Sequence, residues 1–78
     1  MDPQTITILL GRYPGLMFGR THIQYGSIHQ EVILDGVSCF ASWSAHDYKF
    51  FLQHDGLDKI TVQVKMIEMA LREKRLIN

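Results

Sequence analysis

Apolar and polar residues alternate through much of the first half of the chain, and turn signals interrupt the alternation. Residues 5–10 (TITILL) alternate and are rich in β-branched side chains, which predicts a first strand. Pro14-Gly15 suits the central positions of a type II turn, so we expect the chain to reverse there. Three further strands are predicted, over residues 17–25, 28–34 and 37–42.

Two turn signals, Gly26-Ser27 and Asp35-Gly36, predict how these strands pair. A two-residue loop places its flanking residues opposite each other, so Tyr25 should face Ile28 and Leu34 should face Val37. The mostly apolar face then carries Thr21, Ile23, Tyr25, Ile28, Gln30, Val32, Leu34, Val37, Cys39 and Ala41. The other, mostly polar face carries Phe18, Arg20, His22, Gln24, His29, Glu31, Ile33, Ser38, Phe40 and Ser42.

The pattern changes to a helical period after residue 44. Ser44 to Asp47 has the form of a capping box, and apolar residues at positions 48, 51 and 52 predict a helix over residues 45–54 that Gly56 ends. Asp58 is the expected N-cap of a second helix with apolar residues at 60, 64, 67 and 71. Residues 59–65 also alternate, so a fifth strand stays open as an alternative.

The predicted fold is therefore a single compact α+β domain over residues 1–78. Its four-stranded antiparallel sheet has the order ββββαα, with the two C-terminal helices packed on one face. The other face is left to water or to a partner.

Composition narrows the classes of function. Hydrophobic residues make up 46% of the chain, which is enough for a globular core. The formal net charge is zero, which argues against a general nucleic-acid binder. One cysteine permits no intrachain disulfide, and no apolar run approaches the length of a membrane span. The N-terminus lacks a basic region, so no signal peptide is expected and the predicted location is the cytoplasm, of the host cell if the protein is viral.

Candidate chemistry is sparse. The predicted register places His22 opposite Glu31 with His29 nearby, a set that suits a divalent metal, although a solvated polar pair is favoured and no metal or other cofactor is predicted. Cys39 falls on the core face, where a thiol is usually a small hydrophobe rather than a nucleophile. Asp47 is explained by the helix cap, and its neighbour His46 points in another direction.

Glycines at positions 11, 15 and 19 are evenly spaced in GRYPGLMFGR, with Arg12 and Arg20 beside them. The segment matches neither a phosphate-binding loop nor a dinucleotide fingerprint. Such a loop can hold an anion, but turn formation and close backbone approach are the favoured roles.

No catalytic set survives, so the sequence favours a non-enzymatic module that covers a surface of a protein or ribonucleoprotein partner. Aromatic and arginine side chains on a bare sheet face are typical of such an interface. A phage- or virus-encoded inhibitor of host machinery, of the anti-CRISPR kind, is the favoured specific form, by analogy of size and lack of motifs. The alternatives are a nucleic-acid-binding regulator and a small metal-dependent enzyme, and a homodimer is also open. The candidate contact residues are Arg12, Phe18, Arg20, His22, His29, Glu31, Phe40, Arg72, Lys74 and Arg75.

Overall fold

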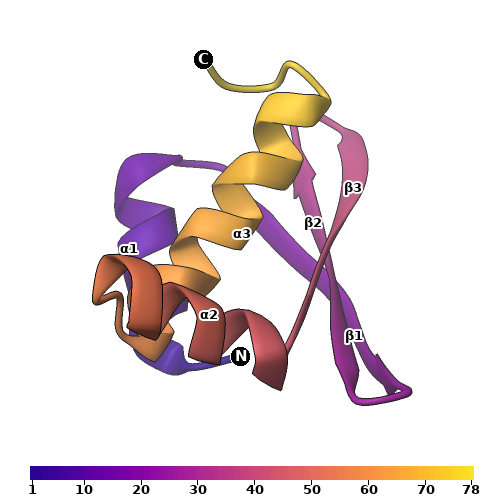
Figure 1. Ribbon diagram of the computed structural model, residues 1–78. Coiled ribbons are helices and arrows are strands. Elements are labelled where there is room, and N and C mark those ends of the chain that lie inside the picture. Colours follow the sequence, from indigo (N-terminus) through magenta and orange to yellow (C-terminus); the bar gives the residue numbers. More distant parts are fainter.

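A computed structural model describes all 78 residues and shows three helices on the same side of one sheet (Figure 1). The elements follow the order α1 (Pro3–Arg12), β1 (Met17–Gln24), β2 (Ser27–Leu34), β3 (Val37–Ser44), α2 (Ala45–Asp55) and α3 (Lys59–Glu73). The strands form an antiparallel sheet in the order β1-β2-β3. The chain is thus α+β, but the predicted ββββαα order is wrong because the sheet has three strands and a helix precedes them.

The first predicted strand, residues 5–10, is part of helix α1. The Asp2 carboxylate caps this helix by accepting a hydrogen bond of 2.9 Å from the amide of Gln4, and Pro3 occupies its first turn. Thr5 and Leu9, four residues apart, are its buried positions. The Asp-Pro start and burial at helical spacing therefore outweigh the β-branched composition on which the strand prediction relied.

The predicted turn at Pro14-Gly15 is confirmed, although it joins a helix to a strand rather than two strands. The amide of Leu16 donates to the carbonyl of Tyr13 across 3.1 Å. Gly15 has a φ of 92°, which its position in the turn requires and which glycine adopts without strain.

The two hairpins show one correct and one incorrect register prediction. Leu34 pairs with Val37, as predicted, whereas Ile28 pairs with Ile23 instead of Tyr25. The first turn is Tyr25-Gly26, and both residues have positive φ, as do Asp35 and Gly36 in the second turn. Glycine takes the second central position in both hairpin turns, as in the Asn-Gly type of turn, and the prediction had placed Gly26 first.

A β-bulge interrupts β1 between Phe18 and Thr21. Beyond the bulge Phe18 pairs with Val32, a fully buried core residue, and packs against the core. An extra residue in one strand reverses the faces of the side chains on one side of the bulge relative to those on the other side. Phe18 therefore lies on the helix side of the sheet, and its predicted place on the polar face is wrong.

Both C-terminal helices form where they were predicted. The capping box of Ser44 and Asp47 is present at the start of α2, and Gly56 ends the helix with a φ of 66°. The Asp58 carboxylate caps α3 by accepting from the amide of Thr61 across 2.8 Å. Because α3 is continuous from Lys59 to Glu73, the alternative fifth strand at residues 59–65 is wrong.

The core lies between the sheet and the helices, with α3 against β3 and α1 against α3 (Figure 1). Four side chains form a hydrogen-bonded set that we call the Gln63 network, and they are Thr5, Trp43, Tyr48 and Gln63. The Gln63 side chain accepts from the Thr5 hydroxyl across 2.6 Å and donates to the Tyr48 hydroxyl across 2.9 Å. The Tyr48 oxygen also accepts from the indole of Trp43, across 2.6 Å. The network thus joins α1, α3, α2 and β3.

Replacing Tyr48 by phenylalanine tests how much this network contributes to the stability of the fold. The Tyr48→Phe change removes the hydroxyl that accepts from two donors, one on the buried Trp43 and one on the buried Gln63. We expect the free energy of unfolding to fall by about 2–4 kcal/mol in urea denaturation, because each donor left without a partner costs about 1–3 kcal/mol. The matched Tyr25→Phe change, at a side chain that is 96% exposed, should alter stability by less than about 0.5 kcal/mol. Equal effects of the two changes would contradict this role.

Candidate functional site

The sheet side chains that point away from the helices form what we call the open face. Their positions follow from the register, which places His22, His29 and Ser42 in one row across the three strands and Met17, Ile33 and Ser38 in another. Glu31 and Phe40 pair between these rows. The members of the open face are Met17, His22, His29, Glu31, Ile33, Ser38, Phe40 and Ser42.

The open face has an apolar part that water reaches. Met17 is 61% exposed and Phe40 is 51% exposed, and the half-buried Ile33 pairs with Met17. The ring of His22 stacks on His29 with centroids 4.9 Å apart and meets the edge of Phe40 at 6.4 Å. Exposed apolar and aromatic groups of this kind, surrounded by polar side chains, are typical of a surface that contacts another protein.

Glu31 is held at the bulge. Its carboxylate accepts a hydrogen bond of 2.6 Å from the Ser38 hydroxyl and one of 3.1 Å from the amide of Arg20. These bonds, the Ser38 bond first, lower the pKa of Glu31 below its ordinary value, and the Arg20 charge adds to the effect. Glu31 therefore presents a fixed negative charge beside the apolar part of the open face.

The His22, His29 and Glu31 set considered for a metal does not assemble. His22 pairs with His29 rather than with Glu31, and Glu31 is committed to Ser38 and Arg20. The other ring contact of His29 is a hydrogen bond of 2.7 Å between its Nδ1 and the Ser42 hydroxyl oxygen. No three His, Cys, Asp or Glu side chains gather as metal ligands would.

Gly19 belongs to the same arrangement. A β-carbon at this position would lie 2.8 Å from the Cδ of Glu31, inside the space that the carboxylate occupies. The predicted role of this glycine, close backbone approach, is thus observed in the bulge. Arg12 and Arg20, the arginines flanking the glycine-rich segment, are separated, because Arg12 lies at the end of α1.

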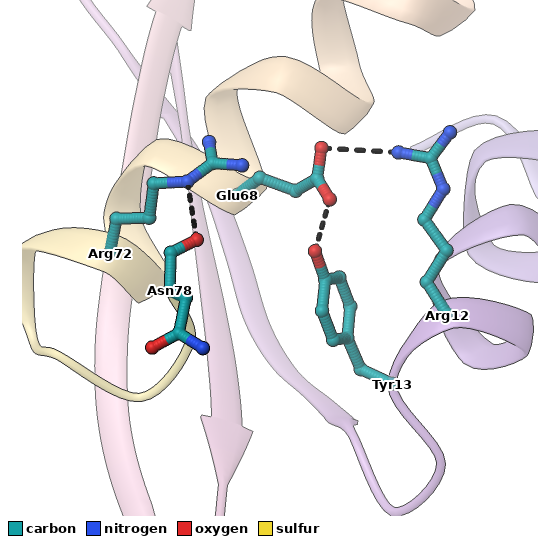
Figure 2. Close-up of polar contacts among 5 residues, drawn as sticks. All are labelled: Arg12, Tyr13, Glu68, Arg72 and Asn78. Atoms are coloured by element: carbon teal, nitrogen blue, oxygen red, sulfur yellow. Dashed lines mark hydrogen bonds and ion pairs between the residues drawn. The ribbon is translucent and has the colours of Figure 1, made fainter.

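A second polar cluster lies between α1 and α3 (Figure 2). Glu68 accepts a hydrogen bond of 3.2 Å from Arg12 and a second one from the Tyr13 hydroxyl. Burial, followed by the bond to Glu68, raises the pKa of Tyr13 above its ordinary value. Arg72, one turn after Glu68 on α3, does not pair with it and donates instead to the main-chain oxygen of Asn78 across 3.1 Å (Figure 2).

This cluster borders a groove of about 400 Å³. The Glu68 carboxylate of the cluster pairs with Arg12, and Arg72 donates to the main chain at Asn78. Both arginines therefore connect different parts of the fold. No local pattern predicts the contact of Tyr13 with Glu68, since the two residues are distant in the chain. The groove is lined by Ile8, Arg12, Leu57, Thr61, Val64, Lys65, Glu68 and Arg72.

The structure divides the predicted contact residues into separate groups. His22, His29, Glu31 and Phe40 share the open face, with Arg20 at the bulge beside them. Phe18 packs toward the core, Arg12 and Arg72 line the groove, and the exposed Lys74 and Arg75 follow α3. Met17 is not among the predicted contact residues, because it is the bulge that brings its side chain to the open face.

Cys39 is buried, and desolvation raises the pKa of its thiol. A thiol in this state is a poor nucleophile, since the thiolate is the reactive form. No helix is both long enough and apolar enough to cross a lipid bilayer. Searches against family models, curated proteins and solved structures found no match to this chain.

Replacing Gly19 by alanine tests the arrangement at the bulge. The new methyl group should displace the Glu31 carboxylate from Ser38 and Arg20, so the pKa of Glu31 should rise toward its ordinary value in an NMR titration. A lowered pKa in the folded state stabilises the fold above the ordinary carboxyl pKa, and this contribution disappears as the pH falls through the folded value. The Gly19→Ala variant should therefore lose stability at neutral pH and show a weaker pH dependence below it.

The matched control is Gly11→Ala in α1, where no atom lies within 4 Å of the added β-carbon. This change should stabilise the protein by about 0.5–1 kcal/mol, because alanine is the better helix former. An unchanged Glu31 pKa in the Gly19→Ala variant would show that the carboxylate is not held as described.

Proposed function

We propose that this protein is a non-enzymatic binding module that covers a surface of a protein partner with its open face. The observation that supports the proposal most strongly is the exposed apolar surface of Met17 and Phe40 on a sheet face that the helices leave bare (Figure 1). An apolar centre with a polar rim is the common anatomy of protein interfaces. In its specific form the proposal is an inhibitor of host machinery, encoded by a phage or a virus and acting by occlusion.

The chemistry of the open face indicates what the partner surface should offer. Met17, Ile33 and Phe40 call for an apolar patch opposite them. The Glu31 carboxylate, which accepts from the backbone amide of Arg20, and the charged Arg20 itself both belong to the rim, so a partner needs both signs of charge nearby. Such a mixed rim contributes to orientation more than to long-range attraction.

A nucleic-acid partner is less well supported by this geometry. Stacking of bases on a sheet requires several exposed aromatics beside cations. Phe18 is turned toward the core, and the carboxylate of Glu31 lies beside the only arginine of the bulge. A complex with nucleic acid would weaken steeply with added salt, whereas the proposed protein complex should show a shallow dependence.

The proposal is tested by two matched charge substitutions. Met17→Asp places a carboxylate on the open face, and Leu52→Asp makes the same kind of change on α2, where the side chain is 60% exposed against 61% for Met17. Each tagged variant is used to capture partners from a lysate of the cells in which the protein acts, followed by quantitative mass spectrometry. A partner that wild type and Leu52→Asp both retain should be reduced at least about tenfold with Met17→Asp, since burying an unpaired charge costs more than about 1.4 kcal/mol.

Both variants must first show the thermal unfolding of a folded protein. Equal recovery of every partner by the two folded variants would argue against the open face as the working surface. Loss of the same partner with Leu52→Asp alone would place the contact on α2.

A further inference from the structure

The outer edge of β3 is unpaired, because this strand is the last in the sheet. In a two-residue hairpin the residues that flank the turn, here Leu34 and Val37, form a hydrogen-bonded pair. Hydrogen-bonded and non-hydrogen-bonded pairs then alternate along the antiparallel ladder. The amides and carbonyls of Ser38, Phe40 and Ser42 therefore point outward, where the sheet offers them no partner.

The two edges of the sheet differ in how they are protected. β1 carries a bulge and the charged Arg20, both of which hinder pairing with another strand. β3 (VSCFASWS) contains no charged residue and no proline, and it pairs with β2 without a bulge over its whole length. A long, uncharged and regular edge of this kind is a template for a further strand.

A groove of about 240 Å³ follows this edge. From the strand it is lined by Phe40 and Ser42 of one face and Ala41 of the other. From α3 it is lined by Met66 and Met69. Ala70 and Glu73 complete the α3 side, and Glu73 is the only charged residue of the lining. The edge is therefore accompanied by flexible apolar side chains that suit a second strand and its side chains.

We propose that the occupant of this edge is β3 of a second copy of the chain. With a two-fold axis at Phe40, antiparallel pairing places Ser38 opposite Ser42 of the partner subunit and the two Phe40 rings next to each other. The outward amides of one β3 then face the outward carbonyls of the other and can hydrogen-bond to them, because the same alternation repeats on both sides of the axis. Because β3 contains no charged residue, the pairing brings no like charges of the two strands together. The two three-stranded sheets become one six-stranded sheet.

This pairing does not depend on the proposed function, and it has its own test. Sedimentation velocity from micromolar to millimolar concentration should show wild-type protein passing from monomer to dimer. Phe40→Lys should stay monomeric over this range, because it places two ammonium groups together at the axis. The matched Met17→Lys change, on the same face but at the other edge, should leave the dimer intact.

The register is tested by oxidation of the Ser38→Cys/Ser42→Cys double variant in a Cys39→Ala background. Directly opposite residues of a hydrogen-bonded pair have Cα atoms about 5.5 Å apart, which a disulfide can span. The double variant should form covalent dimers, and each single variant should not. A wild-type chain that stays monomeric, or a folded Phe40→Lys variant that still dimerises, would overturn the proposal. A double variant without covalent dimers, or single variants that form them, would overturn the β3 pairing.

Discussion

The arrangement of the three helices depends on the hydrogen bonds that meet at Gln63. This side chain, buried on α3, holds the Thr5 hydroxyl of α1 on one side and the Tyr48 hydroxyl of α2 on the other. Tyr48 in turn holds the indole of Trp43 on β3. A buried amide with unpaired groups is costly, so any shift of one helix away from the others leaves polar atoms unsatisfied. The network therefore keeps all three helices on one face of the sheet.

This arrangement of the helices leaves one face and one edge of the sheet free. Only three strands are available, and the helices all lie on the side of Trp43, so the open face keeps Met17 and Phe40 in water. The bulge at Gly19 and the Glu31 carboxylate interrupt β1, which leaves β3 as the regular edge. The contacts of Glu68 with Arg12 and Tyr13 tie α1 to α3 (Figure 2). The proposed contacts with a partner and with a second copy thus both use the side of the molecule that the helices do not cover.

Local signals explain which parts of this structure the sequence could predict. The Asp35-Gly36 turn, the capping box at Ser44 and the Asp58 cap each act within a few residues, and the elements beside them form as expected. The helix over residues 3–12 replaces the strand predicted for residues 5–10, because the Asp2 cap, Pro3 and burial at helical spacing outweigh the β-branched alternation. The bulge has only a weak local signal, the glycine at position 19, and the Glu31 carboxylate that contacts it comes from another strand. That one insertion moved Phe18 off the open face and brought Met17 onto it.

Oxidative footprinting can measure whether the helices cover one face of the sheet and leave the other bare. Hydroxyl radicals oxidise accessible methionine, tryptophan and cysteine side chains, and peptide mass spectrometry reports the rate at each residue. At a dilution that keeps the chain monomeric, Met17 on the open face should be oxidised rapidly. Trp43, which is 2% exposed, and Cys39 should react slowly until the protein is unfolded. Rapid oxidation of Trp43 in the folded protein together with protection of Met17 would show that the helices do not cover the Trp43 face.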